Sequence, residues 1–437
     1  MFGFLLNMMK IQTQQKPVHT VNNISFKGLG TVASSEVQNN AMLNRSLIDM
    51  FGVCVPWAIM ANNKDEKREK IIRFSIGFAI PFLTPFVILP ILNKSAMKYI
   101  VKITTKFNSN DYKAIWLSNK FLKNSSDTST GLKDLALKYH LNEKEILKFC
   151  NNSYETLRKK LIKSKNAVML CDLLFTSVVW ANAQWISNQA TKFLTGKKGS
   201  SAEYSMANKE LVEKRAETHE KNKKKKWLGV MGLCTAMSIV TAGLVNKSLL
   251  TKKTGGFLKY VQDKAVNFDY KKGVYMPKFP LFLVAFFGAG LGTLSAARNK
   301  TELKDLSIRV GSLDALYFTG DLAIASILSR LCDKTFKTDL MKKEYSKNNL
   351  WNKIFPPAQK IDEITNIKSK KYALGIYWAS MLSLMGLLGF AVPAITNKLT
   401  RKDIEQDLAK QSLNNIHNLS DLISPKSREL FKEFVKS

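Results

Sequence analysis

The sequence predicts an all-α, multi-pass transmembrane helical bundle of six or seven spans, built from helical hairpins with polar helical insertions. The run between Arg73 and Asn93 is uncharged and has about the 20 residues that a helix needs to cross the hydrocarbon of a bilayer. It ends in an Asn-Lys pair, as do two later apolar stretches, at residues 246–247 and 397–398. Each of these stretches follows a partner stretch with an aspartate near its start, which indicates hairpins joined by basic segments.

The charge of the chain is strongly positive. Its 437 residues include 67 Lys and Arg against 34 Asp and Glu, a formal net charge of +33. A surplus of this size suits an anionic partner, either acidic lipid head groups or nucleic acid. The alternative is a genome that favours lysine, asparagine and isoleucine, together with loop lysines that fix membrane orientation.

The first 165 residues divide into three parts. Residues 1–45 are polar and aperiodic, so we expect a disordered segment. Residues 46–94 predict the first transmembrane hairpin, whose second arm contains three prolines that predict a kink. Residues 95–165 are basic and polar and predict a soluble helical insert. In this insert Asn142, followed by Glu145, and Ser153 are suited to cap helices.

The rest of the chain repeats this alternation of apolar and polar segments. Residues 166–248 predict a second transmembrane hairpin with a long basic loop, and residues 249–308 a connector followed by a Gly-rich apolar helix. Residues 309–398 predict the third transmembrane hairpin. Residues 399–437 predict a polar C-terminal helical tail.

An internal repeat is one interpretation of the hairpins. Asp49, Asp172 and Asp314 lie early in the first arms, and an Asn-Lys pair closes each second arm. The alternative is that helix ends favour Asn and Lys in any case. The apolar run at 279–297 decides the orientation. If it crosses fully, the third hairpin is inverted relative to the others; if it does not, all three point the same way.

Aspartates inside apolar runs form the candidate intramembrane polar site: Asp314, Asp321, Asp172 and Asp49. Asp321 lies about halfway along its run, where a carboxylate must face a polar interior, pair with a cation or take up a proton. Asp314 lies two turns earlier on the same face, and the pair suits proton or cation handling. The alternative is a tilted span whose carboxylates reach an interface or bond neighbouring helices. Asp49 and Asp172 lie nearer helix starts, where the helix dipole also favours a carboxylate.

Two further patterns concern packing and surface contacts. Gly288, Gly292 and Ala296 form a small-residue ridge that lets two membrane helices approach closely, and the spacing of these glycines does not fit a dinucleotide fingerprint. The run Lys223, Lys224, Lys225 and Lys226 is the candidate contact for anionic lipid, the alternative being a merely solvated face. The insert at 95–165 lacks a basic recognition helix, so we do not expect nucleic acid as a partner.

No catalytic residue, metal site or cofactor is predicted. The four histidines are far apart and lie in polar segments, and the five cysteines form no CxxC pair. We interpret the cysteines as reduced, small apolar side chains. The sequence contains no nucleophile elbow, HExxH motif or phosphate-binding loop.

Residues 20–100 resemble a known group of proteins. The likeness rests on SFKG at Ser25–Gly28, on SLIDMFGVCVPWAIMANNKDEKREK, and on the proline-rich arm that ends ILNKSAMK. In these motifs the chain is similar to an uncharacterised family of multi-span membrane proteins from gut-dwelling, non-photosynthetic relatives of cyanobacteria. The resemblance implies a membrane protein and no particular activity.

These patterns lead to an expectation and two alternatives. We expect a multi-pass protein of the bacterial cytoplasmic (inner) membrane that handles or transports a small solute, ion or lipid, with Asp314 and Asp321 lining the path. The first alternative is a non-catalytic membrane scaffold whose basic loops bind anionic lipid or a partner protein. A membrane enzyme is the least supported, because a carboxylate pair without His, Cys or metal ligands specifies no reaction. The sequence does not give the oligomeric state.

Overall fold

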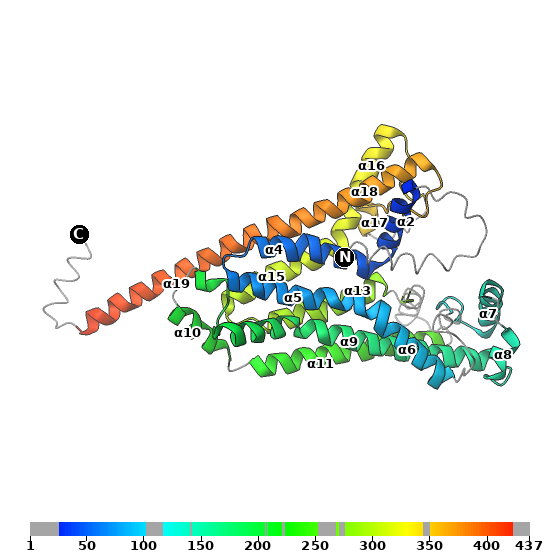
Figure 1. Ribbon diagram of the computed structural model, residues 1–437, viewed down its shortest axis with the longest axis horizontal. Helices are drawn as coiled ribbons and strands as arrows, with labels where there is room; N and C mark the ends of the chain where they lie inside the picture. The colour runs from blue at the N-terminus through cyan, green and yellow to red at the C-terminus, as the bar shows by residue number, and fades with distance from the viewer. Residues whose placement is uncertain are drawn as a thin grey trace.

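The computed structural model describes residues 26–101, 117–139, 142–205, 207, 209–220, 223–251, 268–270, 276–343 and 350–422. The chain is an elongated bundle of helices (Figure 1). Within the described residues there is no strand, and the one bridge of strand type joins Met341 to Ala358. The predicted fold class, an all-α multi-pass bundle, is confirmed.

In the described part of the chain six helices are long and apolar enough to cross a membrane. Several are interrupted by short π-helical turns, labelled η. Two are unbroken α-helices, Tyr154–Thr195 (α9) and Lys223–Leu250 (α11). Two connect shorter elements in the first and fourth positions: Lys64–Val101 (α5 Lys64–Leu83, η2 Thr84–Ile88, α6 Leu89–Ala96, η3 Met97–Val101) and Lys278–Ser295 (α13 Lys278–Leu283, η6 Val284–Gly290, α14 Leu291–Ser295). The last two are Lys300–Phe336 (α15 Lys300–Ala315, η7 Leu316–Gly320, α16 Asp321–Phe336) and Ile367–Lys410, which covers α18 (Ile367–Gly386), η8 (Leu387–Ala391) and the first part of α19 (Val392–Leu422).

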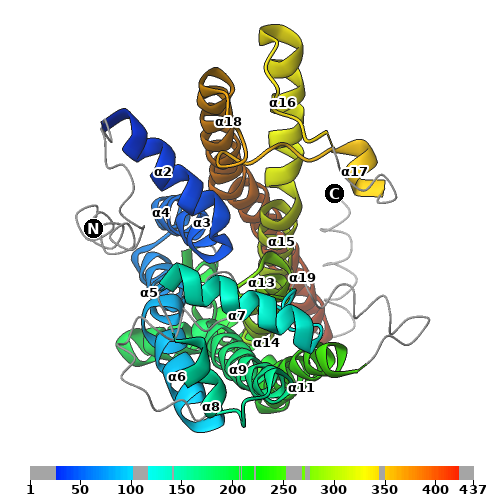
Figure 2. The same cartoon turned by 90° about the vertical axis from the view of Figure 1, so that its right-hand side faces the viewer.

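Shorter elements fill the rest of the described chain. They are α2 (Phe26–Asn39), α3 (Ala41–Leu47), η1 (Ile48–Cys54), α4 (Val55–Ile59), α7 (Ser125–Tyr139), α8 (Glu143–Lys148), the 3₁₀ turn η5 (Glu203–Ser205), α10 (Lys209–Glu220) and α17 (Leu350–Ile354). The insert helices α7 and α8 lie at the end of the bundle where α9 begins (Figure 1, Figure 2). The first arm of the first predicted hairpin corresponds to η1 and α4, which do not belong to the six apolar helices.

Helix α9 is the centre of the bundle, and α5, α11, η6 and α14 all pack against it. Helix α5 runs antiparallel to α9, because Ser187 lies opposite Glu69 and Trp180 opposite Gly77. Helix α11 is also antiparallel to α9. The segment η6–α14 is parallel to α9. Helices α5, α11 and α15 therefore begin at one end of the bundle, where α9 and α14 finish.

This arrangement decides between the two predicted orientations of the third hairpin. The run at 279–297 forms a continuous helical path, α13–η6–α14, along the same bundle as α9. Helix α15 then starts at the end where α9 stops, and α19 returns antiparallel to it, as the contacts from Arg309 to Asn397 and from Lys304 to Asp403 show. Within the bundle the third hairpin is therefore inverted relative to the other two.

The outer surface of the bundle is rich in exposed large apolar side chains. They lie on α5 to α6, α11, α16 and α18 to α19: Ile71, Leu83, Phe86, Val87, Ile91, Leu228, Leu233, Ile239, Val240, Leu244, Leu322, Ile327, Leu331, Leu382, Leu387, Phe390 and Ile395. A water-soluble protein rarely exposes so much contiguous apolar surface. Lipid chains would cover these side chains and remove the cost of exposing them to water.

The predicted helix caps of the insert are present. The side chain of Asn142 accepts a hydrogen bond from the Glu145 amide at the start of α8, and Ser153 accepts one from Thr156 at the start of α9. Helix α9 then runs without a break to Gly196, which takes the left-handed conformation (φ 69°) that glycine adopts without steric cost. The proline-rich arm, predicted to kink, contains the π-helical turn η2 at Pro85.

Three predicted boundaries need correction. Residues 26–45, expected to be disordered, form α2, the cap Asn40 and most of α3, and Ser34 and Gln38 of α2 bond Trp378 and Ile361. The remainder of the predicted disordered segment, residues 1–25, lies outside the described residues. The boundary at residue 165 falls inside α9, because a helix capped at Ser153 has no reason to stop there. The third hairpin begins not at residue 309 but at Lys300, after the cap Asn299.

The Gly-rich ridge lies against α9. A Cβ atom built on Gly292 would come within 2.3 Å of the Ala181 Cα, and one on Gly288 within 2.7 Å of the Ser177 carbonyl oxygen. Both neighbours are backbone atoms, which cannot rotate away. Ala296, the third residue of the ridge, is buried beyond the end of α14, and its carbonyl accepts a hydrogen bond from Asn188.

Candidate functional site

Two matching turns meet at the end of the bundle where α5 and α15 begin. In the first, Asn63 accepts a hydrogen bond from the Glu66 amide, and the Glu66 carboxylate accepts one from the Asn62 amide at 2.7 Å. In the second, Asn299 and Glu302 repeat these bonds, with the Arg298 amide as donor to Glu302 at 2.5 Å. Each turn is a variant of the capping box in which the return donor is the residue before the cap, and it fixes the first turn of the helix that follows.

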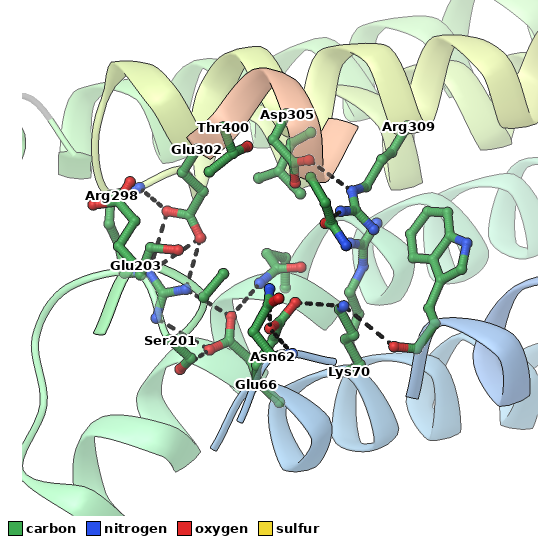
Figure 3. A pocket seen from close by; sticks show the side chains of 18 residues that line it. Asn62, Glu66, Lys70, Ser201, Glu203, Arg298, Glu302, Asp305, Arg309 and Thr400 are labelled. Carbon is green, nitrogen blue, oxygen red and sulfur yellow. Dashed lines mark hydrogen bonds and ion pairs between the residues drawn. The ribbon is translucent and has the colours of Figure 1, made fainter. Parts of the chain in front are cut away.

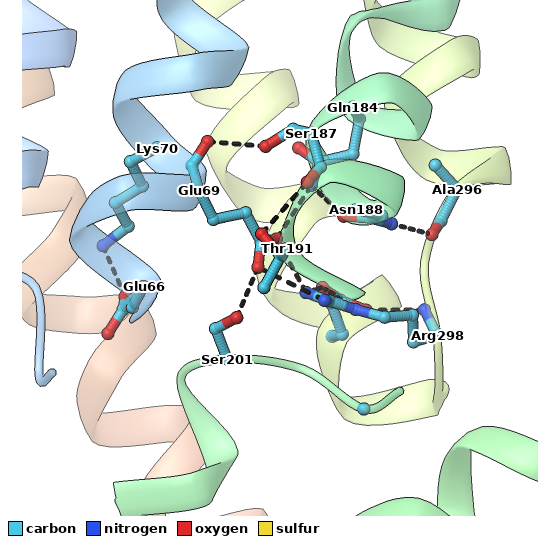
Figure 4. A network of polar contacts seen from close by, with 12 residues as sticks. Glu66, Glu69, Lys70, Gln184, Ser187, Asn188, Thr191, Ser201, Ala296 and Arg298 are labelled. Atoms are coloured by element: carbon cyan, nitrogen blue, oxygen red, sulfur yellow. Dashed lines mark hydrogen bonds and ion pairs between the residues drawn. The ribbon is translucent and has the colours of Figure 1, made fainter. Parts of the chain in front are cut away.

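A buried polar network joins these turns to α9 (Figure 4). Arg298 pairs with Glu302 at 2.6 Å and with Glu69 at 2.7 Å. Glu69 also accepts hydrogen bonds from Gln184 on α9 and from Ser201 in the following loop. Burial alone lowers the pKa of Arg298, but the two carboxylates outweigh it and raise that pKa above its ordinary value. This network ties α5, α9 and the start of α15 into one rigid end.

Glu203 lies at the edge of the network and is fully buried. One carboxylate oxygen accepts hydrogen bonds from Asn299 at 3.0 Å and Arg215 at 3.4 Å, whereas the other has no partner within the described residues. Desolvation raises the pKa of Glu203 to about 7, despite the opposing charge of Arg215. Glu203 is therefore a buried carboxyl group that exchanges its proton near neutral pH.

A half-open cavity of about 60 Å³ lies beside this network (Figure 3). By the space that one buried water requires, it has room for about four water molecules. Acidic and basic side chains share its wall. The charged lining residues are Glu66, Glu69, Glu203, Glu302, Asp305, Lys70, Arg73, Arg298 and Arg309. Two further buried atoms of its wall have no hydrogen-bond partner in the described part of the chain, the Gln184 side-chain oxygen and one terminal nitrogen of Arg309.

Two of the predicted aspartates share one arginine deeper in the bundle. Arg45 lies 3.3 Å from Asp49 and 3.3 Å from Asp314, and all three side chains are largely buried. The guanidinium also lies 4.8 Å from the centre of the Tyr317 ring and 5.8 Å from that of Trp180. Aromatic faces attract a desolvated cation, so this arginine is held by both charge and ring contacts.

The other two predicted aspartates lie apart from that cluster. Asp321 pairs with Lys278 on α13 at 2.9 Å, and the Lys278 ammonium is 5.8 Å from the Tyr317 ring centre. Asp172 on α9 is fully buried and accepts a hydrogen bond from the Tyr270 hydroxyl at 2.8 Å. The structure therefore brings together Asp49, Asp314 and, through Tyr317, Asp321, but not Asp172.

The lysine run lies at the start of α11. Lys224, Lys225 and Lys226 are exposed, whereas the Lys223 ammonium lies 4.7 Å from the centre of the Trp185 ring. Trp185 and Trp227 pack edge to face at 6.5 Å. Lysines beside tryptophans are typical of the boundary between membrane and water.

Among the described residues, no group of three or more His, Cys, Asp or Glu side chains is arranged so that it could hold a metal ion. The five cysteines are free and lie on different elements.

Reasoning from sequence named the intramembrane aspartates but missed the network and the cavity. One signal was present in the sequence. The two turns share the pattern Asn-Lys-x-Glu followed, six residues after the Glu, by Ile-Arg, at Asn63–Arg73 and at Asn299–Arg309. The cation partners Arg45 and Lys278 were also missed, although Arg45 stands one helical turn before Asp49.

Comparison with known proteins gives no match: no family model fits the sequence, and no characterised protein and no solved structure is similar to the chain. The six apolar helices are compatible with an integral membrane protein. What the chain does must therefore be argued from its own side chains.

Proposed function

We propose that the protein passes a small solute or ion through its helical bundle, from the half-open cavity inward along a line of charged side chains. The single observation that supports this is the succession of ionisable side chains along α15, η7 and α16. Glu302, Asp305 and Arg309 line the cavity, and Asp314, Tyr317 and Asp321 follow on the same helical segment. From 302 to 321 a helix rises about 28 Å, close to the thickness of the hydrocarbon layer.

Pairwise interactions connect the charged side chains along this proposed path. Arg73 on α5 lies within electrostatic range of both Arg309 and Asp49. Asp49 pairs with Arg45, which also pairs with Asp314 and lies over Tyr317. Tyr317 is in turn next to Lys278, the partner of Asp321. Charges at such depth are costly unless they are paired, and ionisable residues inside spans commonly mark transport pathways.

The pathway is closed in this arrangement. Neither Asp314 nor Asp321 lines the cavity, which ends at Arg309 and Asn397. Passage therefore requires the pairs of Arg45 and Lys278 to open in turn. Two π-helical turns lie at these pairs, η1, which contains Asp49, and η7, which ends just before Asp321, and such turns are frequent at functional sites.

Reconstitution into liposomes tests the proposal. Proton movement is followed with an internal pH-sensitive dye and inorganic phosphate movement with radiolabel, each under a potassium diffusion potential. We expect protein-dependent flux of one of them, which Asp314→Asn and Asp321→Asn abolish without reducing the amount of inserted protein. Asp339→Asn, a change at an exposed carboxylate of the loop before α17, is the control that keeps full flux. If neither probe moves with the unmodified protein, or if both variants keep full flux, the proposal fails.

The scaffold function remains the second candidate, and one observation favours it. The lysines at the start of α11 stand beside the Trp185–Trp227 pair, an arrangement suited to acidic lipid head groups. The bilayer, and anionic lipid in it, is the proposed partner, with a protein partner as the alternative. Placement in a bacterial cytoplasmic membrane rests on the resemblance of residues 20–100.

A further inference from the structure

We infer that Arg73 and Arg309 form a binding site for a small oxyanion, such as phosphate, at the inner wall of the cavity. This inference rests on the proposed function, for which it names the class of substrate. The two arginines occupy equivalent places, since each stands ten residues after the asparagine that caps its helix, Asn63 or Asn299. The matching turns therefore deliver two guanidinium groups to one cavity.

The two arginines differ from the other cations in how they are satisfied. Lys70 pairs with Glu66 at 2.5 Å, and Arg298 has two carboxylate partners. Arg73 has no carboxylate oxygen within 4 Å in the described part of the chain; its terminal nitrogen donates to the Thr293 hydroxyl at 3.3 Å. Its nearest acidic neighbour along α5, Glu69, is already held by Arg298.

Arg309 has an unused donor. Its Nε bonds Asp305 at 2.8 Å and one terminal nitrogen bonds Asn397 at 2.9 Å. The other terminal nitrogen is buried without a partner among the described residues, although Arg309 is only 4% exposed. A buried donor left unpaired destabilises the folded protein, so the site gains from any acceptor that enters it.

The cavity as a whole is lined by five acidic and four basic side chains, but its inner wall carries a positive excess. There Lys70 and Arg309 are matched by Glu66 and Asp305, and Arg73 leaves one positive charge over. Arg73 and Arg309 also repel each other across the same space. An oxyanion placed between them accepts from the free donor of Arg309, pairs with Arg73 and removes that repulsion, using the planar donor geometry that suits guanidinium groups.

The cavity also limits the size of the ligand. A volume of about 60 Å³ suits one phosphate-sized ion, either free or as the phosphate of a lipid head group, and it has no room for an acyl chain. Further cationic side chains lie deeper in the bundle, first Arg45 and then Lys278. An anion that exchanges from the Arg73–Arg309 pair to the next cation would follow the proposed path.

The test measures binding rather than flux. Radiolabelled inorganic phosphate is titrated by equilibrium dialysis against the purified full chain in uncharged detergent. We expect saturable binding, which Arg73→Gln weakens at least tenfold. Arg68→Gln, on the same helix but paired with Asp65 and outside the cavity, leaves it unchanged. Arg309→Gln would leave the Asp305 carboxylate without its ion-pair partner. Arg73→Gln breaks no ion pair and is therefore the decisive variant.

A second readout comes from Trp57, whose ring lies 4.8 Å beneath the Arg309 guanidinium. Phosphate should change the tryptophan fluorescence of the unmodified chain, and Trp57→Phe should remove that change. Displacement of bound phosphate by added phosphatidylglycerol would identify a lipid head group as the natural source of the anion, and persistence of binding a free ion. Either result supports the site.

Two outcomes separate this inference from the proposed function. Absence of saturable phosphate binding, or equal binding by the Arg73→Gln and unmodified proteins, overturns the anion site even if protons cross the liposome membrane. Specific binding without flux of either probe leaves the site intact and overturns the transport proposal.

Discussion

At the scale of single residues, the chain buries its charges in matched sets. Arg298 serves two glutamates, Arg45 serves two aspartates, and Asp172 relies on the neutral Tyr270 hydroxyl. Removing one partner from such a set leaves a buried charge uncompensated, which is why buried pairs are sensitive to substitution. Glu203 is less well satisfied, because one of its oxygens is buried without a partner in the described region, as are one oxygen of Asp49 and one terminal nitrogen of Arg309.

Glu203 gives the protein a pH-dependent stability. Between pH 4.5 and 7 the folded chain keeps a proton on Glu203 that the unfolded chain releases, since its pKa is raised to about 7. The free energy of unfolding should therefore fall as pH rises through this window, by up to about 3 kcal/mol for this one group. Thermal unfolding in detergent at several pH values measures the fall.

Glu203→Gln should flatten that dependence, because the amide has no proton to lose, whereas the exposed Glu210→Gln should leave it as it is. An unchanged slope in Glu203→Gln would assign the pH dependence to other groups.

At the scale of elements, the close contact between η6–α14 and α9 depends on two glycines, which have no side chain. Gly288 and Gly292 let the two helices touch through their backbones, so the contact tolerates no added atom without a shift of one helix. Because Gln184 and Asn188 lie just beyond on α9, such a shift also disturbs the polar network at the turn.

Gly292→Ala should lower the free energy of unfolding by about 1–3 kcal/mol through overpacking against Ala181. The matched control is Gly232→Ala on α11, where an added Cβ has nothing within 4 Å. That control should be neutral or raise stability by about 0.5–1 kcal/mol, the usual gain for Gly to Ala inside a helix. Thermal midpoints in the same detergent provide the comparison, and equal midpoints for Gly292→Ala and the unmodified protein would refute the packing argument.

The sequence predicts the helices well and their partners poorly. Apolar runs and caps such as Asn142 and Ser153 are local signals, and they give the elements directly. The pairs that hold the bundle together join residues far apart: Arg45 is 269 positions from Asp314, and Tyr270 is 98 positions from Asp172. Periodicity shows which face of a helix is polar, but it does not show which distant helix that face meets.

The same limit applies to the domain boundaries. A change of composition at residue 165 does not interrupt a helix whose backbone bonds continue, so α9 passes through it. Residues 26–39 look aperiodic by themselves, yet α18 and the loop before it provide partners for Ser34, Gln38 and Asn39. Tertiary contacts supplied order where the local signal was weak.

At the scale of the whole molecule, the alternating helix directions fix which loops share a side. Helices α5, α11 and α15 begin at one end of the bundle, and α9, α13 and α18 begin toward the other (Figure 1). The lysine run and the cavity belong to the first end. By the preference of basic loops for the cytoplasm, we predict that this end faces the cytoplasm.

Reporter fusions test this topology. Fusions after residues 63, 205 and 300 should report the cytoplasmic side, and fusions after 265 and 350 the opposite side, because an odd number of spans separates the two groups. A fusion after residue 300 that reports the same side as one after 265 would show that Lys278–Ser295 does not cross the membrane.

The length of α9 has a mechanical consequence. Its 42 residues make a rod about 63 Å long, roughly twice the thickness of the hydrocarbon layer. One end is clamped by Arg158 to backbone carbonyls beside α7 and at the end of α11, and the other by Asn188 and Gln184 to the polar turn. An unbroken helix bonded at both ends connects the insert directly to the charged turn. We therefore expect a change in the tilt of the insert to displace the charged turn at the opposite end of α9.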